Sequence, residues 1–191
     1  MLFQLALLRP NLAPPRGAVV LEELPFDAVA AAKINFSGMW TRVHSDGLVE
    51  SLVARGRKQD EAEQIASAPY IMKWERAAKP LVWKVTTMQE DMKTPIRSLE
   101  YPLGEWKETI ANFDVSAPFD EAGVVARTTS YSPVESAIGG LVHFTRSASP
   151  SGCVETVSRY LVEGGMVCTR FLEPTSGGKS YESLELFARL D

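Results

Sequence analysis

The sequence predicts an all-β protein, a closed antiparallel barrel of about ten strands with a helix-turn-helix lid directly after the first strand. Three observations support this fold class. Short segments rich in β-branched and aromatic residues recur at intervals of roughly ten residues from Tyr70 to the C-terminus. Stretches rich in Gly, Pro, Asp and Ser separate these segments, as turns do in all-β folds. From residue 34 onward, helical periodicity is confined to residues 46–68.

The first strand is predicted over residues 34–45, "INFSGMWTRVHS". Phe36, Gly38 and Trp40 share one face of this strand, because side chains alternate between the two faces. A glycine allows the sharp bend that barrel closure requires, and it leaves a gap above Gly38 for another side chain. Two interpretations stay open: an aromatic plug at the closed end of the barrel, or an ordinary core strand that contains a glycine.

The lid is predicted as two short helices. Residues 46–56, "DGLVESLVARG", place Leu48 and Leu52 at helical spacing and end at a glycine, which suits a helix C-terminus. Residues 57–68, "RKQDEAEQIASA", continue as a second helix that Pro69 ends.

The strand-like segments that follow are short and partly alternating. A turn is expected at residues 103–106, "LGEW", between two of them. The segments are residues 70–77, 81–88, 95–103, 107–115, 124–132, 141–148, 154–163, 166–173 and 180–190.

Composition excludes several classes of function. The formal net charge of −4 offers no broad basic field for nucleic acid, so no nucleic-acid partner is expected. There is no run of about 18 apolar residues, so no membrane span is expected. Cys153 and Cys168 form no metal-ligand motif, and no cofactor or metal is expected. Either the two are free thiols or they pair across neighbouring strands.

The first 34 residues are predicted to be an extension outside the barrel domain, which covers residues 35–191. The start of the chain is apolar, contains two arginines and has no acidic residue before Glu22, as in a transit-peptide remnant. Pro10, Pro14 and Pro15 argue against a continuous amphipathic helix and favour an arm that lies on the domain or on a partner. If this segment is an arm, the protein is expected in the cytoplasm. If it is a transit-peptide remnant, the protein is expected in a plastid or a mitochondrion.

Residues 36–56, "FSGMWTRVHSDGLVESLVARG", resemble without a gap the opening of the intracellular fatty-acid-binding protein family, which includes the cellular retinoid-binding proteins. Residues 77–85, 119–132 and 155–159 resemble later parts of the family in the same order. The resemblance covers residues 34–191, and the N-terminal extension has no counterpart. It implies one strand, a two-helix lid, nine further strands and an internal cavity that holds one long apolar molecule.

In this family a carboxylate head group is commonly held by two arginines and a tyrosine. The resemblance places one arginine at Arg159, whereas the positions of the second arginine and the tyrosine fall on Glu185 and Phe187. A buried Glu185 opposite Arg159 would form an internal ion pair and repel a carboxylate. The expected ligand is therefore apolar and not a simple fatty-acid carboxylate. A shift of one residue in register would instead turn Arg159 toward solvent.

Other side chains leave alternatives open. Leu48, Leu52 and Ile65 either line a portal or form plain core under the helices. Arg170, which precedes Phe171, is expected in solvent. The tryptophans at positions 74, 83 and 106 either face the cavity or form an exposed docking surface. The predicted ligand-binding residues are Phe36, Trp40, Leu48, Leu52, Arg159, Glu185 and Phe187.

No catalytic constellation is found, so the protein is not expected to be an enzyme. His44 and His143 are the only histidines, and no cysteine or paired carboxylate stands near them at ligand spacing. The first hypothesis is non-enzymatic binding or transport of an apolar, lipid-like small molecule in the barrel. The alternative is a ligand-free barrel that serves as an accessory or scaffold subunit and contacts a protein partner through its N-terminal arm.

Overall fold

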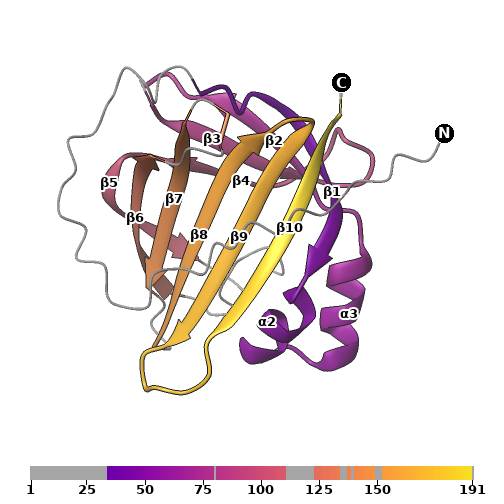
Figure 1. Cartoon of the computed structure of the whole chain (residues 1–191), viewed down its shortest axis with the longest axis vertical. Helices are drawn as coiled ribbons and strands as arrows, with labels where there is room; N and C mark the ends of the chain where they lie inside the picture. Colours follow the sequence, from indigo (N-terminus) through magenta and orange to yellow (C-terminus); the bar gives the residue numbers. More distant parts are fainter. Residues whose placement is uncertain are drawn as a thin grey trace.

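The computed structural model describes residues 34–79, 81–110, 123–133, 137–138, 140–148 and 152–190. Ten antiparallel strands form one sheet that curls into a nearly closed barrel, and two helices stand between the first two strands (Figure 1). The elements are β1 Gly38–Asp46, α2 Leu48–Ala54, α3 Gln59–Ser67, β2 Ile71–Arg76, β3 Trp83–Met88, β4 Pro95–Tyr101, β5 Gly104–Ile110, β6 Gly123–Pro133, β7 Leu141–Ala148, β8 Cys153–Val162, β9 Gly165–Pro174 and β10 Tyr181–Leu190.

The order of the strands explains how the barrel closes. Neighbours run β4-β3-β2-β1-β10-β9-β8-β7-β6-β5, so β4 and β5 are the two edges of the sheet. In the described part of the chain no backbone ladder joins these edges, so the predicted ten-stranded barrel is present and is nearly closed, with one seam between β4 and β5. Side chains bridge the seam, since the rings of Tyr101 and Trp106 lie 5.7 Å apart and Arg97 forms an ion pair with Glu108.

The predicted strands and helices are confirmed with one local exception. The segment 103–106 was expected to be a turn, but β5 already begins at Gly104, and Trp106 pairs with Arg127 of β6. Gly104 has φ +80°, a left-handed conformation that turns the chain within very few residues. Residues 111–115 of the predicted strand lie outside the described residues. The N-terminal extension up to residue 33 also lies outside them, and so the predictions of the cellular compartment, which depend on it, are not tested.

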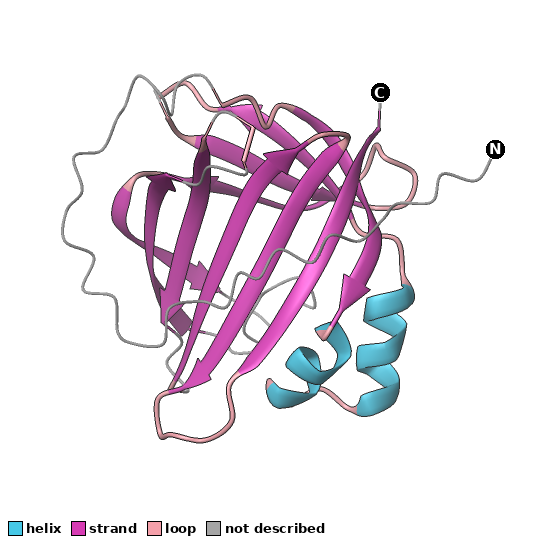
Figure 2. Cartoon of the chain, viewed as in Figure 1, coloured by secondary structure: helices cyan, strands magenta, loops and turns pink. Residues whose placement is uncertain are grey.

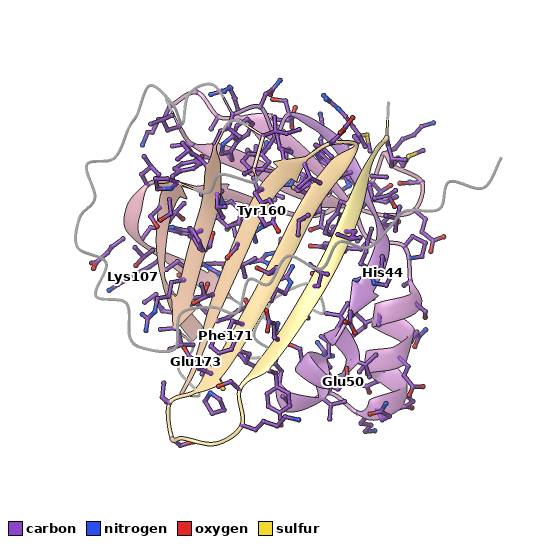
Figure 3. All side chains as sticks on the ribbon, in the orientation of Figure 1. His44, Glu50, Lys107, Tyr160, Phe171 and Glu173 are labelled. Carbon is purple, nitrogen blue, oxygen red and sulfur yellow. The ribbon has the colours of Figure 1, made fainter. Side chains whose placement is uncertain are left out.

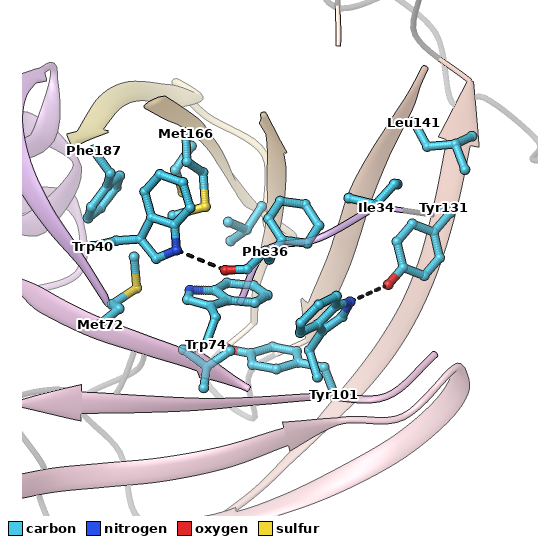
Figure 4. Close-up of a cluster of buried hydrophobic side chains, with 14 residues drawn as sticks. Ile34, Phe36, Trp40, Met72, Trp74, Tyr101, Tyr131, Leu141, Met166 and Phe187 are labelled. Atoms are coloured by element: carbon cyan, nitrogen blue, oxygen red, sulfur yellow. Dashed lines mark hydrogen bonds between the residues drawn. The ribbon is translucent and has the colours of Figure 1, made fainter. Parts of the chain in front are cut away.

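A cluster of buried aromatic and other apolar side chains forms the main core of the barrel (Figure 4). Phe36 is fully buried, and its ring lies 5.1 Å from that of Trp74 and 5.6 Å from that of Trp83. The indole N–H of Trp40 donates to the Phe36 carbonyl at 2.9 Å, so its burial leaves no donor unpaired. Both interpretations of the first strand predict this burial of Phe36 and Trp40.

Gly38 is required in this strand. Its φ is +136°, and a Cβ atom here would lie 2.8 Å from Nε of Arg189. The Arg189 side chain thus occupies the gap above Gly38 that the sequence predicted, and its guanidinium lies 5.8 Å from the Trp40 ring centroid.

The two helices lie together at one end of the barrel (Figure 2). Helix α2 has seven residues and buries Leu48 and Ser51, whereas α3 has nine residues and buries Ala62. Helices this short are marginal in isolation, and they bury little apolar surface here, so other contacts must hold them. None of the helices in the described residues is long and apolar enough to cross a membrane.

The cysteines do not pair. Cys153 on β8 is half-buried, Cys168 on β9 is buried, and both are free thiols, as one of the two alternatives expected. Burial raises the pKa of the Cys168 thiol.

Candidate functional site

A cavity of about 280 Å³ lies inside the barrel under the two helices. Much of its wall is apolar and comes from the lid and from both halves of the sheet. The apolar lining residues are Leu48, Leu52, Ile65, Ala68, Pro69, Met72, Val85, Ile96, Leu99 and Val157. Six arginines and two glutamates line the same cavity, namely Arg42, Arg55, Arg97, Arg127, Arg159, Arg170, Glu155 and Glu185.

Five of these charged side chains form one continuous chain of ion pairs beneath the lid. Glu185 accepts a hydrogen bond from Nη1 of Arg42 at 3.1 Å and another from Nε of Arg170 at 2.7 Å. Arg170 Nη1 also lies 3.7 Å from Glu155 Oε1, and Arg55 completes the chain with an ion pair to the same carboxylate. Both glutamate side chains are almost completely buried, so each relies on its arginines for compensation.

The arginines keep both glutamates ionised. Burial opposes ionisation of Glu185, but the positive charges and hydrogen bonds of Arg170 and Arg42 outweigh it, and the pKa of Glu185 is lowered. Glu155 behaves alike, since Arg55 and Arg170 overcome its desolvation and lower its pKa. Conversely, burial disfavours the charged form of Arg170, but Glu185 and Glu155 hold its pKa well above the usual value.

A second charged group lies at the seam of the barrel. Glu108 of β5 accepts hydrogen bonds from Arg97 of β4 and from Arg127 of β6, where the Nε to Oε2 distance is 2.8 Å. The guanidinium of Arg127 also lies 5.6 Å from the Trp106 ring centroid. These contacts tie the two edge strands together where backbone hydrogen bonds are missing.

Arg159 forms no hydrogen bond or ion pair with either group, although its charge helps to lower the pKa of Glu155. Its side chain faces the cavity and not the solvent, which were the two orientations that the sequence left open. Its Nη1 donates a hydrogen bond to Thr145 Oγ1 at 3.3 Å. Its guanidinium lies 5.3 Å from the ring centroid of Tyr101 and 5.7 Å from that of Trp74. Within the described residues no carboxylate forms an ion pair with it. Arg159 is therefore a buried cation surrounded by rings and a hydroxyl.

The predicted ion pair between Arg159 and Glu185 is wrong. In the sheet both residues align with Cys168, one from β8 and the other from β10, so a whole strand separates them. The backbones of β8 and β10 are therefore two strand spacings apart, about 9.5 Å, which keeps these two side chains from the close approach that adjacent strands allow. Arg170 comes from the strand in between and reaches Glu185 first. The expectation that Arg170 lies in solvent is likewise wrong, because it lines the cavity.

The other predicted site residues divide into two groups. Leu48, Leu52 and Glu185 lie in the cavity wall with Arg159, and so does Ile65. Phe36, Trp40 and Phe187 do not line the cavity but belong to the aromatic core next to it.

The tryptophans do not form an exposed docking surface. Trp74 and Trp83 are each 1% exposed, and Trp106 is partly buried against the same core. The accessory-subunit hypothesis thereby loses two of its supports, the tryptophan surface and the neutralisation of Arg159 by Glu185.

Sequence reasoning missed Arg42, Arg55, Arg127 and Glu155. A signal for two of them was present, because Arg42 follows Trp40 by two residues and Glu155 precedes Arg159 by four, which places each pair on one face of its strand. No such signal marks Arg55, which caps a helix.

His143 offers no further titratable group to this site. It lies in the core among the rings of Tyr101, Tyr131 and Trp74, at centroid distances of 5.6, 5.3 and 5.8 Å. Burial and the nearby charge of Arg159 lower its pKa well below the usual value, so the ring is neutral.

No protein-family model matches the sequence, and no curated protein does. Solved structures do match. Fatty-acid-binding protein 1 of Echinococcus granulosus aligns over 82% of this chain and 98% of its own, with 13% identity and a TM-score of 0.59. The Schistosoma mansoni fatty-acid-binding protein in complex with arachidonic acid aligns over 82% and 96%, with 13% identity and a TM-score of 0.57. Zebrafish ileal bile acid-binding protein complexed with cholic acid aligns over 81% and 98%, with 10% identity and a TM-score of 0.54.

The chain therefore has the fold of the intracellular lipid-binding proteins, a ten-stranded barrel with a two-helix lid. Within that class it is similar in structure to the fatty-acid-binding and bile-acid-binding proteins, and the resemblance expected from residues 36–56 is confirmed at the level of the fold.

Proposed function

We propose that this protein is a non-enzymatic carrier that holds one apolar small molecule with an anionic group inside its barrel. The observation that supports this most is Arg159, a cation that is 6% exposed, lines the cavity and has no ion pair with any described carboxylate. A buried guanidinium without a counter-ion is costly, and an anion in the cavity would compensate it.

The rest of the wall suits the remainder of such a molecule. Apolar side chains from the lid and the sheet would bury its body, at roughly 25 cal/mol for each Å² removed from water. The cavity volume of about 280 Å³ lies near the lower limit of pockets that hold small molecules. A planar guanidinium pairs well with carboxylate, sulfonate or phosphate oxygens, so these anions share the chemistry of the site.

The sequence suggested that the ligand is not a simple fatty-acid carboxylate, because Glu185 would neutralise Arg159 and repel it. In the structure Arg42 and Arg170 compensate Glu185 instead, which leaves Arg159 for a ligand. That reasoning no longer disfavours a carboxylate. The acids named in two of the similar structures, arachidonic acid and cholic acid, agree with an anionic ligand in this fold.

The test is a matched pair of competitors against a fluorescent apolar anion, 8-anilinonaphthalene-1-sulfonate. We expect the wild type to bind the probe and to release it to dodecanoate at about tenfold to a hundredfold lower concentration than to dodecanol, the range for a hydrogen bond to a charged group. Arg159→Met should abolish this preference. Arg146→Met, at an exposed position on the outer side of β7, is the control and should keep it. Equal displacement by the acid and the alcohol in the wild type, or no binding of the probe, would contradict the proposal.

Partly exposed apolar side chains on the outer face of β7–β10 support a second candidate function, docking to a protein partner as an accessory subunit. They alternate along the strands with residues that line the cavity, so they lie on the opposite face. These side chains are Phe144, Val162, Leu184 and Leu186, and they pack against a buried cluster that includes Tyr160 on β8 (Figure 3).

This second proposal also involves the predicted N-terminal arm. If the arm contacts the partner, deletion of residues 1–33 should release the partner from a complex isolated from the native source, while circular dichroism shows an intact barrel. Retention of the partner by the shortened chain would count against it.

A further inference from the structure

The lid needs an anchor other than apolar packing. Helices α2 and α3 are seven and nine residues long, and together they bury only three side chains, those of Leu48, Ser51 and Ala62. Isolated helices of this length are unstable in water. Contacts of another kind must therefore keep them over the cavity.

Helix α3 is anchored through Arg42 of β1. Nη2 of Arg42 donates to the carbonyl oxygens of Ile65, Ala66 and Ala68 at 2.7, 3.1 and 2.8 Å. The last carbonyls of a helix have no partner within the helix, and a cation at this end is also favoured by the helix dipole. One buried guanidinium thus satisfies the C-terminal end of α3.

Helix α2 is anchored through Arg55, the residue at its C-terminal cap. Arg55 forms an ion pair with Glu155 of β8 and lies within 3.5 Å of Ser51 Oγ of its own helix. The side chains of Arg55 and Glu155 are 9% and 1% exposed, so solvent screens this pair very little.

The two anchors are connected. Arg42 also bonds to Glu185, Glu185 bonds to Arg170, and Arg170 lies beside Glu155. We propose that these five residues, Arg42, Glu185, Arg170, Glu155 and Arg55, form a latch that holds both helices over the cavity and couples their opening. Each glutamate is buried between two arginines, so a break at one link leaves a neighbouring charge uncompensated and weakens the next link.

For the proposed carrier, on which this part of the inference rests, the latch separates two tasks. Arg159 lies outside the latch, so an anion bound there leaves the latch intact and the lid closed over the ligand. An anion that reached Arg170 would compete with Glu185 and Glu155 and would open the lid. The latch therefore sets the rates of entry and exit, whereas Arg159 sets the affinity for the anion.

Glu185→Gln tests the coupling, because Glu185 forms hydrogen bonds with Arg42 and Arg170 but with neither helix. The measurement is hydrogen exchange of the full chain, resolved to single segments. We expect the amides of both helices, residues 48–54 and 59–67, to exchange about tenfold faster or more, since loss of one partner from a buried ion pair is strongly destabilising. Strands β6 and β7 should be unchanged. Faster exchange confined to β9 and β10, or no change in either helix, would overturn the latch.

Two further variants keep this test decisive. Glu75→Gln is the matched control, because Glu75 makes an exposed ion pair with Lys73 and should leave both helices unchanged. If Glu185→Gln does not fold, Arg55→Lys keeps the charge but loses the planar fork. We expect it to speed exchange in α3 as well as in α2, and acceleration of α2 alone would refute the coupling.

Stopped-flow binding of 8-anilinonaphthalene-1-sulfonate separates the latch from the proposed function. In Arg55→Lys the association and dissociation rate constants should both rise by about the same factor, so that their ratio stays within about twofold of the wild type. A changed ratio with an unchanged dissociation rate would contradict a latch. If the wild type does not bind the probe, the carrier function fails, and the hydrogen-exchange result alone decides the latch.

Discussion

The free energy of unfolding should fall more steeply with decreasing pH than surface charges alone would cause, because the barrel buries Glu155 and Glu185 in ionised form. Their pKa values are lowered from the ordinary 4.5: burial raises them, but the neighbouring arginines prevail. A carboxyl with a depressed pKa in the folded state contributes stability above its unfolded pKa and loses it as the pH falls toward the folded value. The sensitive window therefore lies below pH 4.5.

The size of the effect follows from the number of protons. Each proton that only the unfolded chain binds changes the free energy of unfolding by about 1.4 kcal/mol per pH unit. Two glutamates thus supply a slope of up to about 2.7 kcal/mol per pH unit within the window. Glu185→Gln removes one of these protons and should lower the slope by about 1.4 kcal/mol per pH unit at most.

The assay is urea denaturation at closely spaced pH values from neutrality down to the acid limit of folding, for the wild type, Glu185→Gln and Glu75→Gln. Glu75 is 43% exposed at its side chain, so its variant should retain the wild-type slope. An identical slope in the wild type and in Glu185→Gln would refute the conclusion that Glu185 is buried as an ion.

Two other predictions concern the core. Trp83→Phe removes the indole donor that bonds to Tyr131 Oη at 2.9 Å and should cost about 0.5–1.5 kcal/mol of unfolding free energy in urea, since a hydrogen bond inside the core is lost. A loss below about 0.5 kcal/mol would show that this bond does not stabilise the folded state. Cys168 should react slowly with a thiol reagent such as 5,5′-dithiobis(2-nitrobenzoate) in the folded protein, because its thiol is buried and the pKa of that thiol is raised. Labelling of Cys168 in the folded protein as fast as in urea would contradict its burial.

Much of the fold could be predicted because its signals are local. Each strand carries its own alternation of residues, and the helices between β1 and β2 stand out by a change from period two to helical spacing. The placement of Phe36, Gly38 and Trp40 on one face of the first strand was also accessible, since it follows from alternation alone. The start of β5 was missed because Gly104 makes a turn so short that Trp106 already belongs to the next strand.

The site was harder to predict because it depends on register across three strands. Alternation places Arg159 and Glu185 inside the barrel, but it does not reveal that Cys168 lies between them in the ladder. For the same reason the sequence did not show that Arg170 would reach Glu185. The anchoring role of Arg42 depends on where the end of α3 comes to lie, which no pattern within β1 encodes.

The open seam of the barrel illustrates a similar limit. A run of antiparallel strands predicts curling but not whether the two edge strands complete a ladder. Here Glu108 joins Arg97 and Arg127 across the edges, and only the folded arrangement brings the three together.

The central claim is that the cavity takes up one anionic apolar molecule through Arg159. Calorimetric titration of dodecanoate into the wild type and into Arg159→Met tests it most directly. We expect one molecule bound per chain in the wild type and an affinity lower by about tenfold or more in the variant, because Arg159 is the one cavity-lining cation among the described residues that forms no ion pair. Equal affinity of the two proteins, or no saturable binding by the wild type, would contradict the claim.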